Sequence, residues 1–313
     1  YKRNVSKMLE LTLNSGKTIR LTPEHPLLTI DGWKPAQELA KNSLIATPRK
    51  INAFGNSFLT ESEIKLLSYL LAEGHTKRKV VWFTNSDKQI QDEFISCVTQ
   101  FDQNLEVKRM DKYGFRAVRN EETRRFPKNR HSLRQFLIQH NAYDLLAKEK
   151  TIPQIIFSLP KPKLALFLNR LFSCDGSIYF ESNRWRISYS SASEKLAKQV
   201  QHLLLRFEVI SRARNKITKL NGKEFASKEL VIGGESVSKF ISEIGFFGAK
   251  EERQKEAQKY FSTTLRNPNL DTIPKEIWNH YKPQNWAEIG RTMDYKYPKA
   301  LRESMFYSPS RQK

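Results

Sequence analysis

Apolar residues recur at helical spacing in two matching stretches of the chain. Each stretch has apolar residues at i, i+4, i+7, i+8 and i+11, the pattern of a helix with one buried face. Each follows a possible capping box, Ser86–Gln89 in the first and Ser191–Glu194 in the second. The two sets lie 106 residues apart: Ile90, Phe94, Cys97, Val98 and Phe101, then Leu196, Val200, Leu203, Leu204 and Phe207.

A second pair of apolar helices precedes these stretches, and each ends in an acid and a glycine. They lie in 66–74 and 168–176, so that Glu73 and Asp175 are 102 residues apart. Strand-like basic stretches follow in 105–118 and 209–232, and short helices near 136–138 and 240–242. The order helix, two strands, helix, two strands, helix therefore occurs twice. We predict a pseudo-twofold αββαββα repeat with halves at 51–149 and 150–265.

The flanking segments have other patterns. Residues 1–50 alternate like short strands, with a hairpin turning at 14–17 and a further turn at Asp31-Gly32. Residues 266–313 predict two short helices, one capped by Asn285 and one beginning at Pro298. This tail is either a DNA-binding, helix-turn-helix-like unit or two helices packed on the main domain. The expected class is α+β, with an all-β segment before the repeat and a helical tail after it.

The charge balance favours a polyanionic partner. Lys and Arg number 54 against 33 acids among 313 residues, a formal charge of +21. No apolar run of about 18 residues exists, so we expect nucleic acid and no membrane. Cys97 and Cys174 lie inside apolar helical patterns and are expected in the core. The first residues have no signal-peptide pattern, so we expect a reducing, cytoplasmic setting.

An acid at the C-terminal end of an apolar helix needs a compensating charge, because the helix dipole is negative there. If the two helices pack side by side, Glu73 and Asp175 come together, and a divalent cation would relieve their repulsion. Paired carboxylates with Mg²⁺ (or Mn²⁺) are suited to phosphodiester hydrolysis. The alternative is that both acids are solvated helix ends.

These two acid-glycine helices resemble the paired motifs of LAGLIDADG homing endonucleases in their single-chain form, over about residues 60–250. The resemblance implies a monomer that acts as a pseudo-dimer, cuts double-stranded DNA at a specific site and binds catalytic metal through Glu73 and Asp175. Ser68 and Ala72 suit close packing of the helices. Glu73 replaces the commoner Asp, and Arg170 stands where the family has a small residue.

The same resemblance implies two catalytic lysines. Lys150 precedes Ile152-Pro153, and Lys250 follows the Ile-Gly-Phe element at 244–246. Such lysines would stabilise developing charge or position the attacking water. Because lysine is abundant in this chain, surface lysines are the alternative.

Basic residues at alternate positions of the expected strands form the proposed DNA-binding surface, because alternate side chains share one face. In the family, curved antiparallel sheets of this kind lie in successive major grooves. Solvated strand faces are the alternative. The candidates are Lys77, Lys79, Lys108, Arg109, Arg116, Arg184, Arg186, Arg212, Arg214 and Lys216.

Residues 22–26, Thr-Pro-Glu-His-Pro, resemble the Thr-x-x-His block of Hint domains, the self-splicing fold of inteins. The stretches 28–33 and 46–50 resemble inteins inserted in replicative DnaB-type helicases, which would make such a helicase the host extein. The resemblance implies that His25, assisted by Thr22, activates a scissile peptide. No Cys or Ser block precedes Tyr1 and no His-Asn pair ends the sequence, so we expect that this chain does not splice by itself.

Two other functions stay open. A degenerate relative would bind DNA without cutting it, which the Glu73 and Arg170 departures motivate. An RNA maturase is the third possibility, and the splicing block argues against it.

Overall fold

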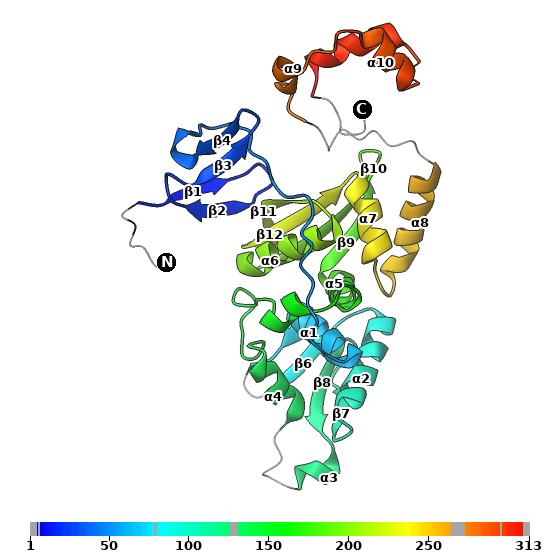
Figure 1. Ribbon diagram of the computed structural model, residues 1–313. Helices are drawn as coiled ribbons and strands as arrows, with labels where there is room; N and C mark the ends of the chain where they lie inside the picture. Colours follow the sequence, from blue (N-terminus) through cyan, green and yellow to red (C-terminus); the bar gives the residue numbers. More distant parts are fainter. Residues whose placement is uncertain are drawn as a thin grey trace. The chain divides into compact units, whose positions relative to one another are not determined.

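The structure is a computed structural model that describes residues 5, 7–77, 80–125, 131–263, 273–294 and 296–308. Helices and antiparallel sheets both occur, which confirms the α+β class (Figure 1). The chain divides into two compact units, one of residues 1–13, 18–48 and 265–313 and the other of 14–17 and 49–264. The finer segment boundaries predicted above stay predictions.

The N-terminal segment contains two short hairpins. Strands β1 (Leu9–Thr12) and β2 (Thr18–Leu21) pair antiparallel, as the alternation predicted. Strands β3 (Pro26–Thr29) and β4 (Gly32–Pro35) form the second hairpin, and a 3-10 helix, η1 (Ala36–Glu38), follows. Gly32, the first residue of β4 after the two-residue turn, has a φ of 104°, a conformation that glycine adopts without strain.

The C-terminal segment has helices α9 (Ile277–His280) and α10 (Trp286–Thr292) and a 3-10 helix, η4 (Pro298–Phe306). The Asn285 side chain accepts from the Glu288 amide, so Asn285 caps α10 as predicted. The helix expected from Pro298 is a 3-10 helix. The rings of Trp278 and Trp286 lie 5.3 Å apart between centroids and tie α9 to α10.

The first half of the larger unit begins with α1 (Glu61–Glu73), capped by a reciprocal pair of hydrogen bonds between Thr60 and Glu63. Next come β5 (Gly74–His75), β6 (Val81–Thr84) and α2 (Lys88–Phe101). Strands β7 (Leu105–Arg109) and β8 (Gly114–Arg119) complete an antiparallel sheet of order β5-β6-β8-β7. Helices α3 (Glu121–Arg124) and α4 (Ser132–Gln139) follow.

The second half has the same order of main elements. After η2 (Gln154–Ser158) come α5 (Lys161–Asp175), β9 (Gly176–Glu181), β10 (Arg184–Ser191) and α6 (Glu194–Leu204). The 3-10 turn η3 (Leu205–Phe207) leads to β11 (Ser211–Leu220), β12 (Lys223–Gly233) and α7 (Glu235–Glu243). Its sheet order is β11-β12-β10-β9, equivalent to that of the first sheet.

The structure corrects one sequence expectation about helices and shows one helix that was not expected. Asp87 and Ser193 cap α2 and α6, so the predicted capping boxes, which put Ser86 and Ser191 at these positions, are wrong. Helix α8 (Lys250–Thr263) was not predicted. Ala257 is its one buried residue, so α8 has no apolar periodicity from which to infer a helix.

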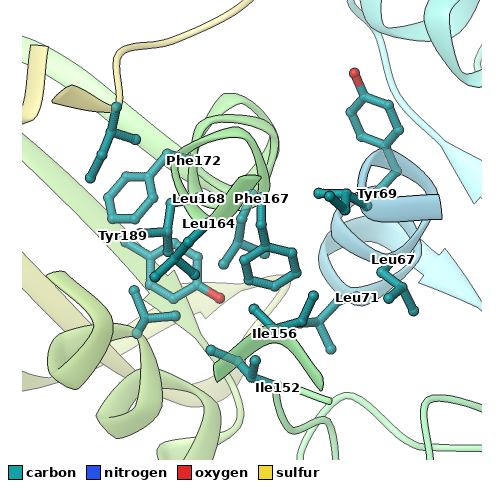
Figure 2. Close-up of a cluster of buried hydrophobic side chains, with 14 of the residues drawn as sticks. Leu67, Tyr69, Leu71, Ile152, Ile156, Leu164, Phe167, Leu168, Phe172 and Tyr189 are labelled. Carbon is teal, nitrogen blue, oxygen red and sulfur yellow. The ribbon is translucent and has the colours of Figure 1, made fainter. Parts of the chain in front are cut away.

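Helices α1 and α5 lie against each other between the two sheets (Figure 1). Ser68 Oγ donates to the Phe167 backbone oxygen at 3.1 Å, a close contact that a larger side chain would prevent. Figure 2 shows Leu71 and Phe167 in one buried cluster with Ile152 and Ile156. A single apolar core therefore fixes the two helices side by side, with their C-terminal ends at the same side of the unit.

Candidate metal and DNA-binding site

The two acids occupy equivalent positions at the ends of α1 and α5. Glu73 and Asp175 are the last residues of their helices, and the next residue of each chain segment begins a strand. Gly74 and Gly176 have extended backbone with φ of −78° and −90°, so they are not the usual left-handed helix stops. A Cβ would lie 2.3 Å from the Leu70 oxygen at Gly74 and 2.5 Å from the Phe172 oxygen at Gly176. Glycine is required by this tight passage from helix to strand.

The environment of the acids disfavours their charged forms. Burial and, to a smaller extent, the nearby Glu73 charge raise the pKa of Asp175 to about 7, although the charges of Lys150 and Lys250 oppose this rise. Burial also raises the pKa of Glu73, but a hydrogen bond from Asn85 Nδ2 opposes this effect. Among the described residues, no hydrogen bond contributes to the pKa of Asp175. The structure therefore brings two half-buried carboxyl groups together, and within the described part of the chain Asp175 has no hydrogen-bond donor.

Each predicted lysine contacts the C-terminal end of one of these helices. Lys150 Nζ donates to the backbone oxygens of Leu70, Ala72 and Gly74 at 3.3, 3.2 and 2.9 Å. Burial lowers the pKa of Lys150, and the charges of Asp175 and Glu73 oppose this effect. An ammonium group at this end of α1 is favourable because the helix dipole is negative there.

Lys250 does the same at the end of α5. Its Nζ donates to the backbone oxygens of Phe172, at 3.3 Å, of Cys174, at 2.9 Å, and of Ser173. Burial lowers the pKa of Lys250, and interactions with Cys174, Glu73 and Asp175 oppose this effect. The structure thus brings all four predicted catalytic residues to one place, while their roles stay predictions.

The caps of α2 and α6 hold the backbone that carries each lysine. Ser193 Oγ donates to the Lys150 backbone oxygen at 2.7 Å. Asp87 Oδ2 accepts from the Ala249 amide at 2.6 Å, directly before Lys250. Each lysine therefore contacts a helix end in one half and has its backbone held by a cap in the other.

Sequence reasoning missed Asn85, which lies one residue after β6. The side chain of Asn85 is buried and donates through Nδ2 to Glu73, with a second contact of 3.8 Å to Cys174 Sγ. Cys174 lies in the site, where burial and the Glu73 charge raise the pKa of its thiol. The available sequence signal was a polar residue directly after the apolar strand 81–84. Its contact with Glu73 depends on the tertiary fold and could not be predicted from the sequence.

The basic residues of the second half share one face of their sheet. The register pairs Arg186 with Gly233, Arg212 with Val231 and Arg214 with Glu229, and directly paired residues lie on the same face. Buried Glu229 binds Arg214 Nε at 2.6 Å and Lys216 Nζ at 2.8 Å, and although burial alone would raise its pKa, these two bonds keep it low. The five predicted residues on this face are Arg184, Arg186, Arg212, Arg214 and Lys216.

Some of these cations already have protein partners. Arg186 Nη1 lies 3.4 Å from Glu181 Oε2. Arg212 Nε donates to the Asn14 backbone oxygen at 3.0 Å, and its Nη2 donates to the Asn14 side chain. Arg184 is exposed on the same strand as Arg186. These contacts fix the directions of the guanidinium groups on the face.

The first sheet corrects part of the predicted surface. Lys108 and Arg116 are directly paired, and the same row continues through Trp82 to His75. Arg109 pairs with Phe115 on the opposite, core-facing side, so it does not belong to this row. Lys77 lies beyond β5, which ends at His75, so it does not alternate along a strand as predicted. Lys79 lies outside the described residues.

The residues of the predicted splicing block lie in the turn between β2 and β3. The His25 amide donates to the Thr22 oxygen at 3.1 Å, and the His25 oxygen accepts from Ala36 N at 2.9 Å. Thr22 is half-buried and His25 is exposed. This geometry leaves the role of both residues a prediction.

Within the described ranges, no cluster of three or more His, Cys, Asp or Glu side chains is suited to bind a metal ion. Glu73 and Asp175 would therefore be the two protein ligands of a metal that takes its other ligands from DNA or water. In the same ranges, no helix has the length and apolar character needed to cross a membrane.

Comparison with known proteins assigns part of the larger unit. A family model described as a LAGLIDADG-like domain matches residues 162–245, from the start of α5 to just beyond α7. The chain is 30% identical over 274 residues to replicative DNA helicase DnaB of Synechocystis sp., covering 85% of this chain and 31% of the helicase. It is 27% identical over 304 residues to the replication factor C small subunit of Methanocaldococcus jannaschii, covering 94% and 15%. The chain spans about a third of the length of the helicase.

Two solved structures are partly similar to this fold. Full-length DUF199/WhiA from Thermatoga maritima has a TM-score of 0.39 at 12% identity, covering 80% of this chain and 91% of that chain. The homing endonuclease I-DmoI in complex with DNA and Mn has a TM-score of 0.36 at 16% identity, covering 59% and 98%. The family match places a LAGLIDADG-like domain at residues 162–245 of this chain.

Proposed function

We propose that this chain is a site-specific, divalent-metal-dependent endonuclease of double-stranded DNA, built as a pseudo-twofold pair of LAGLIDADG halves. One feature carries the function: Glu73 and Asp175 end two packed helices, and Lys150 and Lys250 lie beside them. The LAGLIDADG-like match over the second half supports the same function.

The two acids fit a hard divalent cation such as Mg²⁺ or Mn²⁺. Burial and the Glu73 charge raise the pKa of Asp175 to about 7 against the opposing charges of Lys150 and Lys250, and no hydrogen bond among the described residues contributes to it, so a bound cation would stabilise its carboxylate form. Carboxylate oxygens are the protein ligands that these ions prefer. A bound cation would polarise the scissile phosphate and lower the pKa of the attacking water. The side chains of Glu73 and Asp175 would hold the ion and orient it between the halves.

The lysines would act on the charge that develops during hydrolysis. Each ammonium group is fixed by backbone oxygens at a helix end, so little reorganisation is needed when negative charge builds up on the phosphate. Their lowered pKa values come from burial, which also strengthens their electrostatic effect. Lys150 and Lys250 would stabilise the transition state from the two sides of the metal site.

The basic sheet faces would bind the duplex. Arg and Lys on a sheet can neutralise phosphates and pair with guanine edges in the major groove. Arg184, Arg186, Arg212, Arg214 and Lys216 in the second half and Lys108 and Arg116 in the first are the candidates. The tail would extend this contact.

We further propose that the chain derives from an intein. A helicase and a replication factor C subunit match over 85% and 94% of this chain but over 31% and 15% of their own lengths. An inserted element would produce such a segment, shared by a helicase and a replication factor C subunit over only part of each protein. Thr22 and His25 would then belong to the splicing block, and a replicative helicase would be the host extein.

Cleavage of supercoiled plasmid tests the nuclease directly. The substrate carries the helicase gene without the inserted segment, and the reaction is run with Mg²⁺ and with EDTA. Linear product at one site, lost in EDTA and in Asp175→Asn, is the expected result. Tight binding of duplex DNA without cutting in Mg²⁺ or Mn²⁺ would contradict cleavage and favour a binding protein. Preference for structured RNA in competition would instead favour a maturase.

A further inference from the structure

Arg170 lies in the middle of α5 and forms a two-point ion pair with α2 of the other half. Its Nε and Nη2 donate to the two carboxylate oxygens of Glu93 at 2.6 and 2.8 Å. The side chains of Arg170 and Glu93 are 11% and 16% exposed, so solvent screens this pair weakly. Two parallel hydrogen bonds to a planar carboxylate fix both the distance and the orientation of α5 relative to α2.

Other groups surround the pair and complete its hydrogen bonds. Lys65 Nζ lies 3.0 Å from Glu93 Oε1, and the Tyr69 hydroxyl donates to Glu93 Oε2. Tyr69 extends from α1 away from the cluster of Ile152 and Ile156 (Figure 2). On the other side, the Arg170 guanidinium lies 4.0 Å from the centroid of the Phe247 ring, a cation–π contact. We call Arg170, Glu93 and Phe247 the interhalf clamp.

Two series of contacts connect the interhalf clamp to Lys250. The Phe247 amide donates to Ser173 Oγ at 2.8 Å, near the end of α5. Helix α2, which Arg170 holds through Glu93, carries its N-cap Asp87, and Asp87 accepts from the Ala249 amide. The segment from Phe247 to Lys250 is therefore held by α5 on one side and by α2 on the other.

No equivalent clamp exists at Lys150 among the described residues. The internal offsets of 102, 106 and 100 residues align Arg170 with Ser68, Glu93 with Gln199, and Phe247 with Ala147. Ser68 donates to the Phe167 oxygen, and Gln199 accepts from the Ile152 amide at 2.9 Å. The positions aligned with the ion pair thus make single neutral hydrogen bonds, and a small alanine is aligned with the Phe247 ring.

We infer that the interhalf clamp is a positioning device for Lys250 alone, which makes the two strand-cleavage steps unequal in their dependence on it. The inference rests on the proposed nuclease function. In a twofold arrangement of the halves on duplex DNA, each lysine lies nearer to one scissile phosphate. Loss of the clamp displaces Lys250 and slows cleavage of one strand, while Lys150 keeps its own contacts and the other strand is cut at its usual rate.

Cleavage of a duplex labelled separately on each strand tests the inference. Arg170→Lys removes the two-point pair but keeps the charge, and Glu93→Gln keeps the size of the acid. We expect the rate on one strand to fall by about 10- to 100-fold, the cost of losing an outer partner of a functional group, with nicked duplex accumulating. Ser68→Ala, at the aligned position of α1, is the matched control and leaves the ratio of the two rates unchanged. Equal slowing of both strands, or no change, would overturn the inference.

Amide hydrogen exchange on the free protein separates this inference from the nuclease function. In Arg170→Lys and Glu93→Gln, the amides of Phe247 and Ala249 are expected to exchange faster than in wild type. The Ile152 amide, next to the Lys150 segment, is expected to keep its wild-type rate. Unchanged exchange at Phe247 and Ala249 would overturn the clamp even in a protein that cuts DNA. Faster exchange there would support it even if no cleavage occurs.

Discussion

The two halves of the larger unit have the same order of helices and strands, but they differ in strand length and in several contacts. Strand β5 has two residues and its counterpart β9 has six, and β11 and β12 are about twice as long as β7 and β8. Glu73 has Asn85 as a donor, whereas no hydrogen bond contributes to the pKa of Asp175 among the described residues. Arg170 forms an ion pair where Ser68 bonds a backbone oxygen.

Beyond the order of their elements, the halves share charged groups and backbone geometry at one place. Each keeps an acid at the end of its first helix, a glycine that turns directly into a strand, and a lysine bonded to the last carbonyls of that helix. Packing can change at small cost if the core stays filled, whereas chemistry fixes the types and positions of charged groups. The shared features therefore mark the functional site.

Substitution of Asp175, which has no hydrogen-bond donor among the described residues, should have the largest effect on cleavage. Asp175→Asn keeps the shape of the side chain but removes the charge that would hold the cation. We expect the cleavage rate to fall by more than the roughly 10- to 100-fold that loss of an outer partner of a metal ligand costs. Single-turnover cleavage measures this, and DNA binding in EDTA should stay near wild type. A variant that cuts as fast as wild type would contradict a role for Asp175.

Substitution of Asn85, the hydrogen-bond donor to Glu73, should have a smaller effect on cleavage. Asn85→Ala leaves Glu73 in place but frees its carboxylate, and we expect a rate about 10- to 100-fold lower. Raising the Mg²⁺ concentration should restore part of the rate, because a disordered ligand weakens binding of the ion. If Mg²⁺ titration gives the same half-saturation in the variant and in wild type, Asn85 does not orient a metal ligand.

The raised pKa of Asp175 predicts a pH-dependent stability. Its folded value of about 7 lies above its ordinary value of 3.8, so the folded protein holds an additional proton between these values. The free energy of unfolding should therefore fall as the pH rises from about 4 to about 7. Urea unfolding of wild type and Asp175→Asn without metal measures this, and the variant should have the flatter profile. Parallel profiles would show that Asp175 titrates normally.

The smallest expected effect is on duplex binding, and it concerns the long hairpin of β11 and β12 in the second half. Strand β10 pairs only with 228–233 of β12, so the outer parts of β11 and β12 form a two-stranded ribbon. Phe225 is 52% exposed on the face that carries Lys216, and Ile217 is 63% exposed on the opposite face. Phe225→Ala should weaken duplex binding by about 5-fold, on the order of the cost of one mismatched base pair. Ile217→Ala is the control, and equal effects of both variants would contradict contact through this face.

Helices and strands with a periodic apolar pattern could be predicted from the sequence, and a helix without such a pattern could not. Both acid-ended helices and the capped α10 follow from local patterns, but α8 has almost no apolar face and was missed. The placement of the lysines came from family resemblance, because no local pattern tells a lysine that contacts helix carbonyls from one in solvent. Asn85 and the pairing of Arg170 with Glu93 depend on contacts across the fold, beyond the reach of periodicity.

The most direct test of the paired-acid site is a titration of the Asp175 side chain by NMR with ¹³C-labelled carboxyl groups. We predict a pKa of about 7 in wild type, a lower value in Glu73→Gln because the neighbouring charge is gone, and a lower value when Mg²⁺ is added. A pKa near 3.8 that neither Glu73→Gln nor Mg²⁺ changes would contradict a coupled pair of metal-binding acids at the helix ends.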